Sequence, residues 1–256
     1  MTSELFTHRT EPAGDTRPLE SAFNFRDLGG LPTRNGSTLA SGRLFRSDNL
    51  SRVTSRDLRL LQDLGIRQVI DLRTEAERSR SGTIADTGFE GTVHTIPLLD
   101  VSAAEEAVDP PDDYLIHRYR QILTEGAPGI SRAVSMIASG LPHGSVFHCA
   151  VGKDRTGMIA MVILGLCDVP EEIIVKDYAR TAPAMTEMLV WLSREMPEIA
   201  ARVTEIPPVI MSAIPSTMVA TLDFIDSAFG GFERYAAYAG ISNEVIEKLR
   251  EELVSS

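Results

Sequence analysis

The chain has 256 residues, 43% of them hydrophobic, which is enough to bury a full core as one domain with appendages. Its formal net charge of −11 argues against a nucleic-acid-binding protein, whose contact surface would be basic, and against general adhesion to anionic membranes. Two cysteines are too few for a disulfide framework, and the sequence has neither an apolar run of about 18 residues nor an apolar signal segment. We therefore expect a cytoplasmic protein without stable membrane association and without nucleic acid as a partner, and export without a signal segment stays an open alternative.

The start of the chain predicts a loose arm followed by a compact turn. Residues 1–20 are mostly polar, so we expect a flexible N-terminal arm, with residues 21–256 forming a single domain. The segment NFRDLGG, residues 24–30, then places Arg26 and Asp27 between apolar residues and ends in two glycines. The embedded charges favour a structural ion pair, and the glycines indicate a tight turn.

Apolar periodicity predicts alternating strands and helices over residues 43–166. Short apolar runs indicate strands at residues 43–46, 68–72, 92–98 and 145–147. Helical spacing indicates helices at residues 54–64, 114–123, 130–137 and 156–166, the first with a capping box of Thr54 and Asp57. The expected fold class is therefore α/β, with a mostly parallel central sheet flanked by helices.

Three side chains are expected at one edge of that sheet. Asp71 and Cys149 come at the ends of predicted strands, and Asp100 follows the strand at residues 92–98. Right-handed crossovers bring the carboxyl ends of parallel strands to the same edge, where ligands bind in open α/β sheets. This edge is the expected binding site.

The C-terminal part is predicted to be almost entirely helical. Helices are indicated from Asp168 and Pro170 to Tyr178, over residues 185–192, from a Ser216 cap to residue 229, and from a Ser242 cap onward. Five of the nine methionines fall within residues 185–218, and methionine clusters suit surfaces that repack. Two interpretations stay open for about residues 180–215: a helical lid over the site, or an ordinary helical hairpin that completes the core.

The motif HCAVGKDRTG, residues 148–157, predicts a phosphate site. Cys149 ends a strand and Arg155, six residues later, opens a helix. The backbone N–H groups of residues 150–155 can form a concave anion nest, to which the helix N-terminus adds roughly half a positive charge. Gly152 permits backbone angles that a Cβ would forbid, and the same field favours the thiolate of Cys149.

The chemistry of a phosphoester assigns roles to these residues. Cys149 would attack and form a cysteinyl-phosphate, while the planar fork of Arg155 would grip two phosphate oxygens. Thr156 could hydrogen-bond the sulfur, and Lys153 would add a second positive charge at the mouth of the loop. The candidate catalytic residues are Cys149, Arg155, Asp154, Asp100 and Thr156, and the candidate phosphate-binding residues are Ala150, Val151, Gly152, Lys153, Asp154 and Arg155.

Two aspartates compete as the proton donor to the leaving oxygen. Asp154 lies inside the loop, whereas Asp100 lies on the loop after a neighbouring strand. Each also has a structural explanation: Asp154 as a first-turn helix residue, and Asp100 as a turn residue. His148 is better explained as a support of the loop than as a base.

The remaining cysteine and the histidines suggest no further chemistry. Cys167 follows the helix at residues 156–166, which separates it from Cys149 by roughly 15–20 Å, so the two cannot form a disulfide. It is best explained as a small core residue. The five histidines show no metal-ligand spacing, and we expect neither a metal nor an organic cofactor.

HCAVGKDRTG resembles the HC-x5-R-[ST] signature of the cysteine-dependent protein tyrosine phosphatase superfamily. Together with NFRDLGG, LFRSDNL and the DLR strand end, it resembles more narrowly the bacterial family typified by protein tyrosine phosphatase B. The resemblance runs from about Asn24 into the C-terminal helices. It implies a parallel sheet flanked by helices, often with a helical lid, and no cofactor.

The resemblance also implies substrates and roles. Family members hydrolyse phosphotyrosine, and several accept phosphoserine, phosphothreonine or phosphoinositides, so a phosphorylated protein or a phosphoinositide is the expected partner. It makes Cys149 the nucleophile and Arg155 the phosphate binder, and it favours Asp154 as the acid. Lys153 resembles the loop lysine of phosphoinositide-active relatives. The sequence departs from other superfamily members at residues 98–100, where Leu-Leu-Asp replaces Trp-Pro-Asp.

Two alternatives use the same loop differently. A catalytically inactive module would use it only to recognise phosphate, although the intact Cys149, Arg155 and Thr156 argue against this. A sulfurtransferase or an arsenate reductase would also use a loop cysteine. Arsenate reduction normally needs a nearby resolving thiol, and Cys167 is expected to lie too far away.

Overall fold

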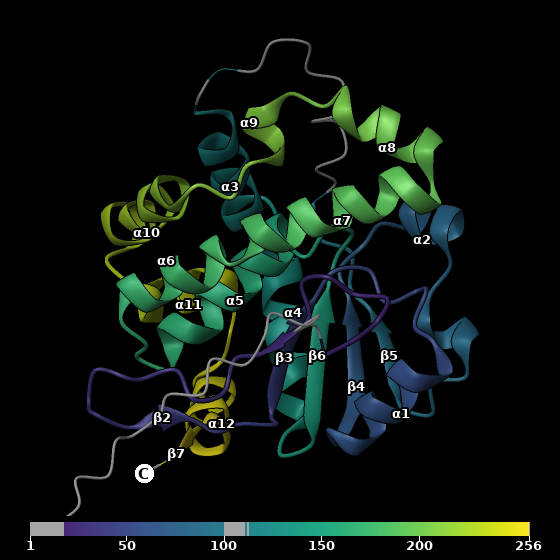
Figure 1. Cartoon of the computed structure of the whole chain (residues 1–256). Coiled ribbons are helices and arrows are strands. Elements are labelled where there is room, and N and C mark those ends of the chain that lie inside the picture. The colour runs from purple at the N-terminus through teal and green to yellow at the C-terminus, as the bar shows by residue number, and fades with distance from the viewer. Residues whose placement is uncertain (1–17, 100–110, 112, 256) are drawn as a thin grey trace, which may run out of the picture.

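A computed structural model describes residues 18–99, 111 and 113–255 (Figure 1). Its main sheet has the strand order β1-β3-β6-β4-β5, with parallel pairing throughout except at β1, which is antiparallel to β3. These strands are β1 (Arg26–Asp27), β3 (Leu44–Ser47), β4 (Ile66–Asp71), β5 (Thr92–Thr95) and β6 (Gly144–His148). A second, antiparallel pair joins β2 (Thr38–Leu39) to β7 (Val254–Ser255).

Helices cover both faces of the main sheet. They are α1 (Ser55–Asp63), α2 (Glu75–Ser81), α3 (Tyr114–Thr124), α4 (Ala127–Gly140), α5 (Asp154–Leu166), α6 (Glu171–Ala179), α7 (Thr181–Glu195), α8 (Pro197–Thr204), α9 (Pro208–Met211), α10 (Pro215–Phe229), α11 (Phe232–Ala239) and α12 (Asn243–Leu253), with a 3-10 turn at Ile84–Thr87. The predicted fold class, α/β with a mostly parallel sheet flanked by helices, is confirmed.

Alternation along the strands separates two hydrophobic cores. Phe45, Val69 and Val146 point to the face covered by α1, whereas Ile70 and Phe147 point to the face covered by α3–α5 and the C-terminal helices. This follows from the period of two along a strand, which sends successive side chains to opposite faces. In α5 every residue except Asp154 and Gly165 is buried, and after its polar first turn this helix is apolar on all sides and crosses the larger core.

The predicted elements match the observed ones closely, with differences at their ends. The capping box of Thr54 and Asp57 is formed, and Ser242 caps α12. Ser216 does not cap α10: the helix begins at Pro215, whose fixed φ suits the first helical position, and the cap position is Ile214. Asp168 also lies outside its predicted helix, in a left-handed conformation with φ of 59°, and α6 begins at Glu171.

Two further expectations from the sequence concern residues that lie partly or wholly outside the described ranges. Residues 1–17 of the expected arm lie outside them, but at its end Leu19 is buried and the Glu20 N–H donates to Asp57 Oδ1 over 2.7 Å. Asp100 also lies outside the described residues. Within the described ranges, no helix combines the length and the apolar character that crossing a bilayer requires.

Candidate active site

The predicted phosphate motif forms a strand–loop–helix turn at the carboxyl edge of the sheet. β6 ends at His148, and α5 begins at Asp154, one residue before Arg155, which was expected to open the helix. His148 is paired in register with Ser47 of β3 and with Asp71 of β4. Cys149, which is 1% exposed, therefore emerges between two neighbouring strand ends, and the predicted proximity of Asp71 is confirmed.

The loop presents free backbone donors and depends on Gly152. The amides of residues 150–155 donate to no acceptor within the described part of the chain, so they remain available to an anion. Gly152 has φ of 67°, and a Cβ there would lie 2.5 Å from Ser47 O and 2.8 Å from Asn24 Nδ2. Both the left-handed backbone and the close approach exclude any larger residue, as the sequence predicted for the backbone angle.

Two N-terminal motifs support the loop from below. Asn24, in NFRDLGG, donates from Nδ2 to Gly152 O over 2.9 Å and to Val151 O over 3.2 Å. Arg46, in LFRSDNL, donates from Nη2 to Gly152 O over 2.7 Å. These bonds hold the loop carbonyls toward Asn24 and Arg46. The amides of the loop are therefore left to face the cavity.

Arg26 and Asp27 do not form the predicted ion pair. Arg26 donates from Nε to Asp177 Oδ1 over 2.7 Å, and Asp177 also binds Arg46. Although burial opposes it, the two guanidinium groups hold the pKa of Asp177 below its ordinary value. Asp27 instead accepts the amides of Gly29 and Gly42, because successive side chains of β1 point in opposite directions.

Arg155 is held by Glu77, a residue that the sequence analysis missed. Nη1 and Nη2 donate to the two Glu77 oxygens over 2.6 Å each, and Nη1 also reaches Leu72 O at 3.5 Å. Nε is buried and has no partner among the described residues. The N–H of Nε and the second hydrogen of Nη2 therefore remain free along one edge, which is the edge that a bidentate grip on phosphate would use.

The position of Glu77 carries a sequence signal. It is the third residue of α2, and with Thr74 it forms a capping box directly after the DLR strand end of β4. Burial opposes ionisation of Glu77, but its bonds and charge interaction with Arg155 lower its pKa to about 2. A capping-box glutamate at the carboxyl edge of a parallel sheet could thus have been recognised as a partner for the loop arginine.

Lys153 is not at the mouth of the loop, where the sequence analysis placed its charge. Its side chain is 1% exposed, and Nζ donates to Ser212 O over 3.0 Å and to Ile210 O. Because Nζ binds these carbonyls at the end of α9, the Lys153 side chain lies buried beneath this part of the chain and does not extend into solvent. Lys153 therefore ties the loop to the segment that follows α9.

His148 and Thr156 lie behind the loop. His148 Nδ1 is 3.2 Å from Cys149 O, which agrees with its predicted role as a loop support, and burial lowers the pKa of its imidazole. Thr156 Oγ1 is buried in the first turn of α5 and has no hydrogen-bond partner among the described residues. The structure thus shows no bond from Thr156 to the sulfur, and its catalytic role stays a prediction.

Asp154 joins a chain of tyrosine hydroxyls that the sequence analysis also missed. Its Oδ1 accepts the Tyr119 hydroxyl at 2.7 Å and lies 3.3 Å from Lys153 Nζ. The Tyr119 and Tyr178 hydroxyls are 2.7 Å apart. Because the tyrosines belong to α3 and α6, only the folded structure brings them to the loop.

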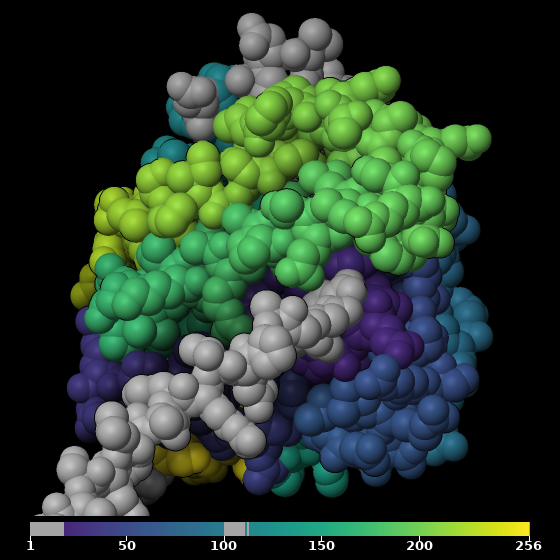
Figure 2. All heavy atoms as spheres, in the orientation of Figure 1, coloured from purple at the N-terminus to yellow at the C-terminus, as the bar shows by residue number. Residues whose placement is uncertain are grey.

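A cavity of about 280 Å³ lies over the loop. Its polar floor includes Lys153, Asp154, Arg155 and Glu77. Its apolar walls come mainly from α7–α9 and the connection between α8 and α9: Met185, Met188, Leu192, Ile199, Val203, Ile206, Ile210 and Met211. Figure 1 shows α7 and α8 running across the top of the sheet, and Figure 2 shows α7–α9 covering this end of the molecule.

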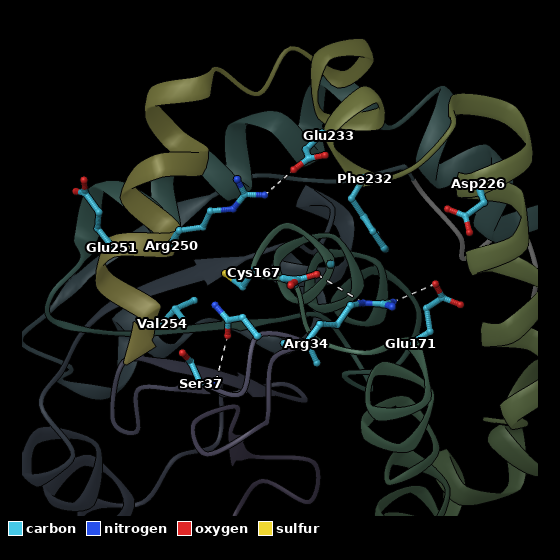
Figure 3. Close-up of a pocket in the computed structure, with 14 residues that line it drawn as sticks. Arg34, Ser37, Cys167, Glu171, Asp226, Phe232, Glu233, Arg250, Glu251 and Val254 are labelled. Atoms are coloured by element: carbon cyan, nitrogen blue, oxygen red, sulfur yellow. Dashed lines mark hydrogen bonds and ion pairs between the residues drawn. The ribbon is translucent and has the colours of Figure 1, made fainter. Parts of the chain in front are cut away.

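A larger hollow, of about 860 Å³, lies at the opposite end of α5 (Figure 3). Arg34 and Arg250 point into it and pair with surrounding carboxylates, at 3.3 Å from Glu171 and 2.8 Å from Glu233 respectively. Cys167 contributes to its lining, and burial raises the pKa of this thiol to about 12. Cys167 is an inert core residue, as predicted, and this hollow is separate from the phosphate loop. Among the described residues, no three His, Cys, Asp or Glu side chains are grouped to hold a metal ion.

Comparison with known proteins finds phosphatases among the relatives of this chain. A relative from Mycobacterium tuberculosis, the triple specificity protein phosphatase PtpB, is 28% identical over 91% of this chain and 97% of its own. A relative from Cupriavidus necator is 26% identical over 84% of this chain and 81% of its own. A tyrosine-protein phosphatase from Nostoc commune is 30% identical over 59% of this chain and 52% of its own. The model of the tyrosine phosphatase family matches residues 17–255, and the chain belongs to that family.

Proposed function

We propose that this phosphatase hydrolyses phosphotyrosine monoesters through a cysteinyl-phosphate on Cys149. The observation that carries the proposal is that Cys149 directly precedes six amides without an acceptor among the described residues, and interacts electrostatically with Arg155, whose Nε also has no partner there. A phosphoryl group seated there would place its oxygens on those donors and its phosphorus in line with Sγ. The apolar walls of the cavity suit the aromatic ring of the leaving group.

The reaction proceeds in two steps. The Cys149 thiolate attacks phosphorus, the P–O bond to the leaving group breaks, and Asp154 gives its proton to the leaving oxygen. In the second step Asp154 takes a proton from water, the water oxygen bonds to phosphorus, and the S–P bond breaks. Inorganic phosphate leaves, and the thiolate and the protonated Asp154 are restored.

Turnover of p-nitrophenyl phosphate tests the proposal. We expect activity in the wild type and its loss in Cys149→Ser, whereas Cys167→Ser should remain active because Cys167 lies beyond the far end of α5. No turnover by the pure wild type would overturn the proposal in favour of a phosphate-binding module. An active Cys149→Ser would overturn the role of the cysteine.

Thiosulfate and arsenate address the remaining alternatives. A reductase would need a resolving thiol, and Cys167, the second cysteine of the chain, is buried with a raised pKa. We therefore expect phosphate release to exceed both thiosulfate and arsenate turnover. The opposite order would replace the phosphatase proposal with a sulfurtransferase or reductase activity.

We extend the proposal to phosphoserine, phosphothreonine and phosphoinositide substrates, with Lys153 as the residue that separates them. A phosphoinositide carries further phosphates that could draw Nζ away from the carbonyls of Ile210 and Ser212. Lys153→Ala should then weaken phosphoinositide turnover more than phosphotyrosine turnover. Equal losses of turnover on both substrates would show that Lys153 does not distinguish phosphoinositides from phosphotyrosine.

A further inference from the structure

Two helices bring a pair of linked hydroxyl groups to the phosphate loop. Tyr119 of α3 and Tyr178 of α6 are 0% and 1% exposed, and their rings pack edge to face with centroids 6.1 Å apart. The Tyr119 hydroxyl lies 2.7 Å from the Tyr178 hydroxyl and 2.7 Å from Asp154 Oδ1. Asp154, in the first turn of α5, is thus bonded by Tyr119 of α3, which is in turn bonded by Tyr178 of α6.

When Asp154 is ionised, the hydrogen bonds between the two tyrosine hydroxyls and Asp154 can have only one set of donors and acceptors. A carboxylate can only accept, so Tyr119 donates its single hydrogen to Asp154 and accepts the hydrogen of Tyr178. Burial raises the pKa of both phenols, so they stay protonated over the range in which a phosphatase works. The Tyr119 hydroxyl, which accepts from Tyr178, is therefore a fixed hydrogen-bond donor to Asp154.

Because of this donor, the two oxygens of Asp154 have different environments. Oδ1 is occupied by Tyr119 and faces Lys153 Nζ at 3.3 Å. Oδ2 has no partner among the described residues, and the Asp154 side chain is 18% exposed where it lines the cavity over the loop. The oxygen that can exchange a proton with substrate is therefore Oδ2.

We propose that Tyr119, supported by Tyr178, is a positioning residue that directs Asp154 Oδ2 at the leaving oxygen. The inference rests on the proposed phosphatase function. A proton donor whose other oxygen is fixed needs no reorientation between the two steps, and such positioning is a large part of general acid catalysis. Tyr119 belongs to the lining of the cavity but is 0% exposed, and in this proposal it acts on the reaction through Asp154.

Burial alone does not account for this arrangement. A buried tyrosine hydroxyl needs a partner, and Tyr235, which is equally buried, uses the backbone carbonyl of Leu123 at 3.0 Å. Tyr119 instead donates to a loop carboxylate. Tyr235→Phe therefore provides a matched control, since it deletes one buried hydroxyl that bonds a backbone carbonyl and not Asp154.

The test is the dependence of kcat/KM on the leaving group, measured with aryl phosphates whose phenols span a range of acidity. p-Nitrophenol leaves with little help, whereas phenol or tyrosine needs the proton. We expect Tyr119→Phe to lose less than about 3-fold with p-nitrophenyl phosphate and roughly 10- to 50-fold with phenyl phosphate. Tyr178→Phe should show a smaller loss with the same trend, and inhibition by inorganic phosphate should not change.

Two comparisons complete the experiment. In an Asp154→Asn background, Tyr119→Phe should cause no further loss, because the two residues act through one proton. Tyr235→Phe should leave the leaving-group dependence unchanged. The ratio between substrates is taken within one protein sample, so partial unfolding of a variant cannot imitate the effect.

Equal losses on every leaving group, or losses that add to those of Asp154→Asn, would overturn the positioning role while leaving the phosphatase function intact. Absence of turnover by the wild type would overturn the proposed function and this inference together.

Discussion

The floor of the cavity and its roof are held in different ways. The floor, residues 148–157 with Asn24, Arg46 and Glu77, is fixed by hydrogen bonds that involve buried and partly buried side chains. The roof, helices α7–α9, rests mainly on apolar contacts, with Trp191 packed 5.8 Å from Phe23 and under the Arg52 guanidinium at 4.6 Å. Hydrogen bonds with strict geometry suit a site where one arrangement must persist, whereas apolar contacts with methionines can repack. We therefore expect the chemistry to depend on the floor, and access of the substrate to depend on the roof.

The largest effect is expected from Gly152→Ala in the floor. The new Cβ would lie 2.5 Å from Ser47 O at a φ of 67°, so the loop must move and its amides would no longer converge. We expect kcat/KM for p-nitrophenyl phosphate to fall by at least about 10²-fold. Gly36→Ala is the control, since φ is 87° but no atom of the described residues would lie within 4 Å of the new Cβ. Equal activity in the two variants would contradict a rigid floor.

A smaller loss is expected when the partner of Arg155 is weakened. Glu77→Gln keeps the shape but removes the charge that holds Nη1 and Nη2, an interaction worth roughly 1.5–2 kcal/mol. kcat/KM should fall roughly 10-fold, while Glu75→Gln on the exposed side of the same helix should have no effect. An unchanged Glu77→Gln would show that the floor orients Arg155 without Glu77.

The same pair predicts how stability depends on pH. The pKa of Glu77 in the folded protein, about 2, lies below its ordinary value of 4.5. Ionised Glu77 therefore stabilises the fold above about pH 4.5, and this contribution is lost as the pH falls towards 2. Allowing for partial exposure, it is on the order of 2 kcal/mol. Denaturant unfolding should show Glu77→Gln less stable than the wild type near neutral pH, with the difference shrinking in acid. A constant difference would argue against the pair.

The smallest effect on chemistry is expected in the roof. Trp191→Ala removes the ring between Phe23 and Arg52, so amide hydrogen exchange in α7 and α8 should become faster. Turnover of p-nitrophenyl phosphate should change less than about 3-fold, because the floor is untouched. Val190→Ala, at a 47% exposed neighbouring position, is the control for exchange. A large loss of turnover in Trp191→Ala would show that the roof takes part in the chemistry.

What the sequence could predict depends on how far apart the interacting residues are. The phosphate loop is contiguous, so its strand, its glycine and its helix were all predicted from residues 145–166. Its supports come from distant segments: Arg26 binds Asp177, which is 151 positions away, and Arg155 binds Glu77, which is 78 positions away. Neighbouring charges such as Arg26 and Asp27 suggested the wrong pairing because a strand turns adjacent side chains apart.

The roof illustrates a different limit. Methionine content pointed to residues 180–215 as a lid or a hairpin, and the structure places this segment over the cavity. Composition could not show that Lys153 would reach Ile210 O and Ser212 O, because backbone carbonyls carry no sequence signal. The start of α10 was also predicted wrongly from the sequence. The helix begins at Pro215 and is not capped by Ser216.

Trapping the intermediate tests most directly whether the floor alone performs the chemistry. The protein is mixed rapidly with an aryl phosphate labelled in its phosphoryl group, quenched and digested. We predict that the label is recovered on the peptide that contains Cys149, with a burst of released phenol that matches the amount of labelled protein, and that Cys149→Ser carries none. Continued turnover with no label on Cys149, or with the label on another residue, would contradict the account.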